Sequence, residues 1–316
     1  MNQPATTAPA RAGVWKSLVR WLDSWAEDER DVLRDPRETD WLRVIPFVLL
    51  HASCAFVLVV GWSWTALAVA VAAYAVRMFA ITAFYHRYFS HRSFETSRPM
   101  QLVFALVGST AVQRGPIWWA SHHRAHHKNS DHVGDVHSPV RDGFWWSHAG
   151  WILSRGNFRP RPELVPDLMK FPELRFLDRF DILVPILSLF GFYGLGEGLA
   201  ALGLQTSGAQ LIVWGFCIST IVTYHITFSI NSVAHRVGSR TYETKDESRN
   251  NFVLSLLTFG EGWHNNHHRY QGSVRQGFKW WELDLSYYLL RLMAVFGLVW
   301  RLNPVPARVI EEGRKR

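Results

Sequence analysis

The stretch WWASHHRAHH, residues 118–127, decides how this chain is interpreted. Within it, His123, His126 and His127 follow an H-x-x-H-H spacing. Residues three and four apart on a helix share one face, so these three imidazoles can point at one place. Neutral imidazole is the most common nitrogen ligand for zinc, copper, iron and nickel in proteins. The stretch therefore predicts a helix that presents metal ligands.

Three further motifs of the same kind occur in the chain. HNNHH at residues 264–268 repeats the spacing, HRYFSH at 86–91 is an H-x-x-x-x-H, and NSVAH at 231–235 places an amide one helical turn before an imidazole. A single metal ion takes about four to six ligands, so nine imidazoles suit two ions with open positions. Nine of the fifteen histidines belong to these four motifs: His86, His91, His123, His126, His127, His235, His264, His267 and His268.

Long apolar runs exclude a protein made of soluble domains only. No Asp, Glu, Lys or Arg occurs from Val44 to Val76, and Glu197 is the single one from Leu183 to Ala234. Each run can hold two spans of roughly 20 residues joined by a short turn. We therefore expect an all-α integral membrane protein with two helical hairpins, and the spans fall at about residues 44–64, 65–85, 183–203 and 210–230.

The cysteine content and the charge limit the kinds of metal site and binding partner that this chain can have. Cys54 and Cys217 both lie inside apolar runs, which leaves no disulfide framework and no thiolate metal site. The net charge is +8, but the Lys and Arg residues flank the spans instead of forming one basic run. Lipid headgroups and the orientation rule explain this distribution, so we expect membrane lipid and no nucleic acid as a partner.

The distribution of charge also predicts how the chain is oriented in the membrane. Both short turns between the expected spans lack Lys and Arg, whereas the N-terminus, residues 86–182 and the C-terminus carry nearly all of them. The positive-inside rule places those three segments, with all four histidine motifs, in the cytoplasm. Residues 1–43 are expected to form a cytoplasmic tail and an amphipathic helix, on the membrane surface or packed on the protein, and 303–316 a charged C-terminal tail.

The surroundings of the motifs suggest supporting groups. Ligating imidazoles usually donate their other N–H to a carboxylate or carbonyl, and Asp131, Asp135 and Glu261 are close in sequence to the motifs. Spacing alone leaves zinc for hydrolysis and iron for oxygen activation both open. The chain lacks G-x-S-x-G and H-E-x-x-H motifs, which favours oxygen chemistry on a lipid substrate. A transporter would place such ligands inside the spans, where only His51 and His225 lie.

In order and context, the four motifs resemble those of the membrane fatty acid desaturases, nearest to the stearoyl-CoA (carbon-9) branch and its bacterial relatives. The resemblance runs from about residue 45 to 300 and implies a desaturase domain over 44–302. It implies a four-helix membrane stalk capped by a cytoplasmic helical domain with a non-haem diiron centre. Such a centre uses O2 and two electrons to remove two hydrogens from an acyl chain, leaving a cis double bond. A histidine-box hydroxylase is the alternative.

The resemblance also assigns roles to residues. It makes the nine histidines of the motifs the ligands of two Fe2+ ions, and Asn231 acts through a metal-bound water. Animal acyl-CoA members have an Arg-Asp pair where this chain has Ser121-His122, and a basic pair where it has Arg155-Gly156. The acyl carrier, coenzyme A, a lipid or a carrier protein, therefore stays open. A separate ferredoxin, rubredoxin or cytochrome with its reductase would supply electrons.

The expected acyl tunnel has candidate contacts along the second span. Ala70 and Tyr74 precede His86 by sixteen and twelve residues, about four and three helical turns, so Tyr74 is a candidate stop for the chain end. Trp119 and Arg155 are further candidate substrate residues. The expected location is the bacterial inner (plasma) membrane.

Overall fold

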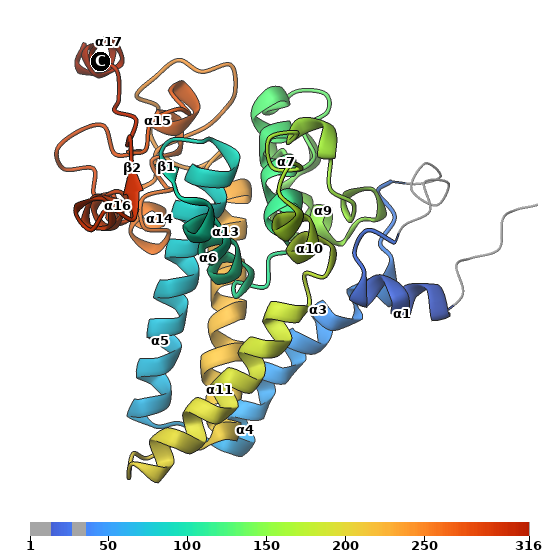
Figure 1. Cartoon of the computed structure of the whole chain (residues 1–316). Helices are drawn as coiled ribbons and strands as arrows, with labels where there is room; N and C mark the ends of the chain where they lie inside the picture. Colours follow the sequence, from blue (N-terminus) through green and yellow to red (C-terminus); the bar gives the residue numbers. More distant parts are fainter. Residues whose placement is uncertain (1–13, 27–35, 316) are drawn as a thin grey trace, which may run out of the picture.

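A computed structural model of the chain describes residues 14–26 and 36–315, so the predicted tail at 1–13 lies outside the described residues. The described part is mostly helical. Long helices form a stalk, and the remaining elements gather at one end of it (Figure 1). Four helices are long and apolar enough to cross a membrane: Trp41–Val60, Trp64–Ser90, Leu183–Ala201 and Gly208–Val233.

Local stop signals set the ends of the first span. It consists of α3 (Trp41–Ser53), a 3-10 turn at Cys54–Phe56 and α4 (Val57–Val60), and it begins at the side-chain cap that Asp40 provides. Gly61 then adopts φ 64°, which ends the helix, and Ser63 caps α5 (Trp64–Phe79). The predicted boundaries at 44 and 64 were therefore each three to four residues too late.

The second span changes its helical type before it ends. After α5 the chain continues as a π-helix, η2 (Ala80–Ser90), so the span extends five residues beyond the predicted end at residue 85. The backbone N–H of His91 donates to the carbonyl of His86 at 3.2 Å, the i+5 bond of a π turn. The first histidine motif is therefore part of this helix and not of the loop after it.

The connection between the third and fourth spans explains why the second apolar run contains one acid, Glu197. α11 (Leu183–Ala201) is followed by α12 (Gly208–Leu211), a π segment at Ile212–Ile218 and α13 (Ser219–Val233). The carboxylate of Glu197 accepts the backbone N–H of Gly208 at 2.8 Å, so the charge satisfies the start of the next helix. This connection and the α4–α5 turn lie at the same end of the stalk, away from α7 and α15 (Figure 1).

The elements at the other end come from three parts of the chain. α1 (Val14–Leu22) packs on α3 through the indole of Trp21, which donates to the carbonyl of Leu42 at 3.0 Å. The 95–179 segment forms β1 (Glu95–Thr96), α6 (Arg98–Ser109), α7 (Pro116–Asn129), α8 (Pro139–Asp142), η3 (Trp146–Gly150), α9 (Trp151–Leu153), short 3-10 turns and α10 (Pro172–Arg179).

The C-terminal part completes this end. It contains α14 (Phe252–Leu257), α15 (His264–Arg269), α16 (Leu285–Val295), β2 (Val299–Trp300) and α17 (Ala307–Arg314). β1 and β2 pair antiparallel, with Glu95 opposite Trp300. α17 lies within the expected tail at 303–316, and its buried Val309 packs against Tyr242.

An aromatic core holds the histidine helices in place. Phe84 of η2 stacks on Phe104 of α6 with ring centroids 3.9 Å apart, and the buried Phe89 packs in the same cluster. Asp178 of α10 accepts the backbone N–H of Trp118 at 2.7 Å, which satisfies one of the free donors at the start of α7. Cys54 and Cys217 are free thiols, in agreement with the sequence.

Candidate metal centre

Five histidines converge on one point, which we call the five-histidine position. His86 and His91 come from the end of the second span, His123 and His127 from α7, and His267 from α15, and their nitrogens lie within 4.8 Å of one another. The Nε2 atoms of His91 and His123 are 2.8 Å apart, and those of His127 and His267 are 2.9 Å apart.

Four histidines form a second group beside the first, which we call the four-histidine position: His126, His235, His264 and His268. The Nε2 atoms of His235 and His264 are 3.0 Å apart. The rings of His127 and His268, one from each position, have centroids 4.5 Å apart. The two positions are therefore adjacent, and together they contain all nine histidines of the sequence motifs.

The π-helix explains the spacing of the first motif. In an α-helix, two residues five apart differ by about 140° around the axis, so His86 and His91 would face different directions. The wider π turn bonds residue i to i+5 and brings them to one face, where their Nε2 atoms are 3.1 Å apart. An H-x-x-x-x-H motif thus serves the same purpose here as H-x-x-H-H does on an α-helix.

Carboxylates orient four of the nine rings through Nδ1. Glu261 lies 2.5 Å from His86, Asp135 3.0 Å from His126, Asp131 2.8 Å from His235 and Asp246 2.7 Å from His268. Such contacts fix the tautomer with Nδ1 protonated and leave the Nε2 lone pair free for a metal. The first three acids were expected from their closeness in sequence. Asp246 was missed, because it lies between the motifs at 231–235 and 264–268 and adjoins neither.

The electrostatics fit a pair of cations. Burial lowers the pKa values of His91, His123, His127, His264 and His267 well below the ordinary value, so these imidazoles are neutral. Neutral Nε2 lone pairs brought within about 3 Å of one another repel unless a cation lies between them. The partnered acids balance such a cation: although burial opposes it, hydrogen bonds and charge from His235 lower the pKa of Asp131 to about 2. The residues present therefore fit two metal ions.

A buried ion-pair network holds Glu261. Arg87 lies 3.0 Å from Glu261 Oε1 and 2.9 Å from Asp284 Oδ1, and these side chains are almost fully buried. The preceding Gly260 has φ 122°, and a Cβ there would lie 2.5 Å from the carboxylate of Asp284. Only glycine fits this backbone beside the network. The network thereby fixes the acid that orients His86.

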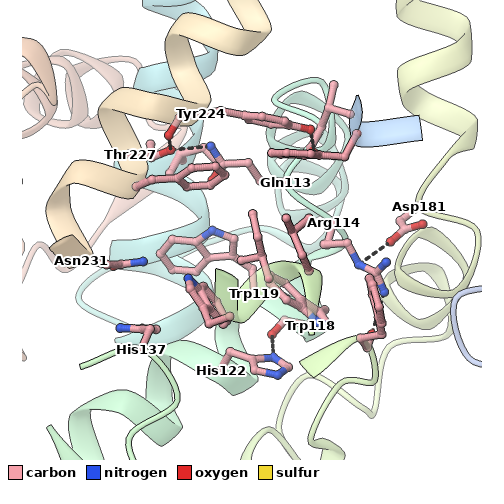
Figure 2. A pocket seen from close by; sticks show the side chains of 18 of the residues that line it. Gln113, Arg114, Trp118, Trp119, His122, His137, Asp181, Tyr224, Thr227 and Asn231 are labelled. Atoms are coloured by element: carbon pink, nitrogen blue, oxygen red, sulfur yellow. Dashed lines mark hydrogen bonds and ion pairs between the residues drawn. The ribbon is translucent and has the colours of Figure 1, made fainter. Parts of the chain in front are cut away.

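A cavity of about 280 Å³ opens beside both positions. Figure 2 shows part of its lining. His86, His123, His126 and His264 line its metal end, together with Asn231, which lies one helical turn before His235. Aromatic side chains form much of the wall, Trp118, Trp119, Tyr224 and Phe228 among them. The opposite side of the view in Figure 2 holds the ion pair of Arg114 with Asp181, at 3.1 Å.

Polar groups occur at a few points of this wall. The amide of Gln113 donates to the hydroxyl of Thr227 at 2.6 Å, and neither residue carried a sequence signal that would have identified it. His122 lines the cavity, and because its Nδ1 donates to the carbonyl of Trp118, its Nε2 is an acceptor, without a partner in the described structure. The indole N–H of Trp151 also lines the cavity without an acceptor among the described residues. Both suit a polar part of a ligand.

The predicted substrate residues differ in their placement. Trp119 lines the cavity. Arg155 is not one of its lining residues and pairs with Glu38 at 3.1 Å. Ala70 and Tyr74 are not lining residues either, and the hydroxyl of Tyr74 donates to the carbonyl of Leu257. The cavity reaches the second span at Ile81, Thr82 and His86.

The histidines outside the motifs have other partners. His51 Nε2 lies 3.3 Å from His225 Nε2, and His225 Nδ1 lies 3.0 Å from His148 Nε2. His137 stacks on His126 with ring centroids 4.4 Å apart, so it supports a motif histidine from outside both positions.

Comparison with known proteins agrees with this geometry. The family described as "Fatty acid desaturase" matches residues 62–303. The chain is similar to an acyl-CoA C20 Delta5-desaturase from Anemone leveillei, with 34% identity over 97% of this chain and 91% of that protein. It is similar to an sn-1 stearoyl-lipid 9-desaturase from Anabaena variabilis, with 36% identity over 83% of this chain and 93% of that protein.

A third relative is the Delta-9 acyl-lipid desaturase 1 of Arabidopsis thaliana, with 38% identity over 83% of both chains. Four membrane-capable helices, two adjacent histidine groups and a match over most of the chain therefore agree. The chain belongs to the fatty acid desaturase family, whose members are oxidoreductase enzymes.

Proposed function

We propose that this protein is an O2-dependent membrane acyl desaturase that introduces a cis double bond, at carbon 9, into a saturated chain carried by coenzyme A or a lipid. One observation carries the proposal: both histidine positions border the same largely apolar cavity, so an acyl chain bound there would pass the metals. Two of the relatives named above are described as 9-desaturases, and one as a Delta5-desaturase.

The nine motif histidines would hold two Fe2+ ions, with Asn231 acting through a bound water. When bound, iron supplies the activation of O2. The overall reaction takes a saturated chain, O2, two electrons and two protons to an unsaturated chain and two waters. The residues of this chain orient the metal ligands and enclose the substrate. Carboxylates fix the rings of His86, His126, His235 and His268. The aromatic wall of the cavity excludes water from the reacting carbons.

The hydrogen bond between Gln113 and Thr227 would bend the bound acyl chain. It lies on the cavity wall near Trp119, above Asn231 in the view of Figure 2. A wall with a fixed projection there favours a folded conformation of the chain over an extended one. A folded conformation at the reacting carbons leads to a cis product.

The setting of the enzyme follows from the charge pattern and the four apolar helices. We place the desaturase domain at 44–302, with the two hairpins crossing the bacterial inner membrane and the helical cap and both termini in the cytoplasm. A separate ferredoxin, rubredoxin or cytochrome, with its reductase, would deliver the two electrons.

Expression in a host that lacks carbon-9 unsaturation, followed by gas chromatography of its fatty acids, tests this function. We expect new monounsaturated chains with the native protein and none with His267→Ala. His132→Ala is the matched control, because this exposed histidine lies outside both positions and should leave the product unchanged. Hydroxylated chains in place of unsaturated ones would identify a hydroxylase instead.

A further inference from the structure

The two histidine positions differ in how many of their rings contact a carboxylate. At the four-histidine position three of the four rings do, through Asp131, Asp135 and Asp246. At the five-histidine position one of the five does, through Glu261. No other described acid lies within 4 Å of a ring nitrogen of His91, His123, His127 or His267.

The cations that contact these acids differ as well. Glu261 and Asp284 share the guanidinium of Arg87. The carboxylates of the three aspartates contact no Lys or Arg among the described residues, and Arg240 reaches Asp246 at its backbone carbonyl, at 2.8 Å. Their other hydrogen-bond donors are neutral: Ser138 and the N–H of Glu247 for Asp131, the N–H groups of residues 131 and 137 for Asp135, and the N–H of Ser248 for Asp246.

We infer that the four-histidine position is the high-affinity metal position, which fills first and empties last, while the five-histidine position exchanges its ion more readily. The inference rests on the ligand assignment of the proposed function. A carboxylate on Nδ1 makes an imidazole a stronger donor, and losing one such partner typically lowers metal affinity about 10- to 100-fold. Two more carboxylate-oriented rings outweigh one additional neutral imidazole.

Graded removal of Co2+ tests the order. The full-length protein, purified in detergent and loaded with Co2+ alone, is dialysed against rising EDTA, and the retained metal is counted by mass spectrometry. We expect two steps, with the second ion released at a chelator concentration at least about 10-fold higher than the first. A single step that releases both ions from the native protein would overturn the inference.

Two matched variants assign the steps. His264→Ala removes a ligand of the four-histidine position and His91→Ala a ligand of the five-histidine position. Neither residue has a carboxylate partner, so neither change leaves an orphaned acid. We expect His264→Ala to abolish the tight step and His91→Ala to abolish the weak one. The reverse assignment would overturn the inference even if both proteins remain folded.

A second pair tests the cause. Asp246→Asn removes the acid from His268 and should weaken the tight step about 10- to 100-fold. Glu261→Gln removes the acid from His86 and should leave the tight step in place. An unchanged tight step in Asp246→Asn would contradict the role of the aspartates. Gas chromatography of products from the same preparations reports separately whether the protein is a desaturase.

Discussion

Gln113 and Thr227 meet across 114 residues of sequence, and the backbone on both sides of Gln113 is strained. The residues on either side of Gln113, Val112 and Arg114, have φ 59° and φ 69°, values that side chains other than glycine adopt at a cost. The carbonyl of Val112 accepts the hydroxyl of Tyr224, which holds the strained turn against α13. Strain kept in place by the surrounding structure indicates that the position of the Gln113 amide matters for function.

Substitutions at Thr227 test the bend in the cavity. Thr227→Val keeps the shape and removes the hydroxyl that Gln113 bonds, so we expect the bound chain to shift and desaturation to fall about 10- to 100-fold. Thr227→Ser keeps the hydroxyl and should retain most of the activity. Gas chromatography of the products measures both, and equal loss in the two variants would mean that packing, not the hydrogen bond, matters.

Gly260 is constrained both by its backbone angle and by its neighbours. Gly260→Ala should lower stability by about 1–3 kcal/mol, because φ is 122° and the new Cβ would meet Asp284 at 2.5 Å and Arg87 at 3.0 Å. The control is Gly297→Ala, at φ 69° with nothing within 4 Å of the added Cβ. Thermal unfolding in detergent compares them. A Gly297→Ala loss as large as that of Gly260→Ala would assign the effect to backbone strain alone.

Asp178 makes the stability depend on pH. Burial raises its pKa to about 7, whereas in the unfolded chain it is about 3.9. Between these values the folded protein binds more protons, so this group favours folding at low pH and the benefit is lost as pH rises toward 7. Asp178→Asn should flatten this dependence, by up to about 1.4 kcal/mol per pH unit. Unfolding scans between pH 5 and 7 measure it, and parallel profiles would refute it.

Tyr74 was proposed from the sequence as the stop for the acyl chain, and in the structure it does not line the cavity, so substitution has to test the proposal. Tyr74→Ala should shift the products toward longer chains, because the change removes a half-buried ring and its hydrogen bond to the carbonyl of Leu257. Tyr74→Phe keeps the ring, packed against Phe259, and should leave the profile unchanged. Feeding acyl chains of different lengths and measuring the products by gas chromatography decides it. An unchanged profile in Tyr74→Ala would show that the ring only packs the span.

The histidine motifs could be interpreted from the sequence because each is local. Ligands three, four or five residues apart need only one helix to bring them together, and two long apolar runs are enough to predict four spans. The errors at the span ends have local causes as well. Gly61 stops the first span early, and the π turns of Ala80–Ser90 carry the second past its expected end.

Contacts between distant segments were beyond such reasoning. Asp246 is an ordinary acid in a polar loop until the fold brings it to His268, and nothing in the sequence pairs Gln113 with Thr227. For Arg155, a candidate substrate residue, the sequence likewise did not indicate the ion pair with Glu38, and this side chain does not line the cavity. Which acid or amide reaches a site depends on how the helices cross, and their packing determines that.

The π-helical end of the second span divides that helix into two parts that must be counted differently. Before Ala80, the helix makes one turn every 3.6 residues, so an ordinary helical wheel shows which side chains face the lipid. After Ala80, each residue of the wider turn rotates less about the axis, so one wheel drawn over Trp64–Ser90 assigns the later residues to the wrong side. A single deletion between Ala80 and Ser90 would let the segment relax to an α-helix and rotate the first histidine motif away from its partners. The length of this segment therefore sets the direction in which the first histidine motif points.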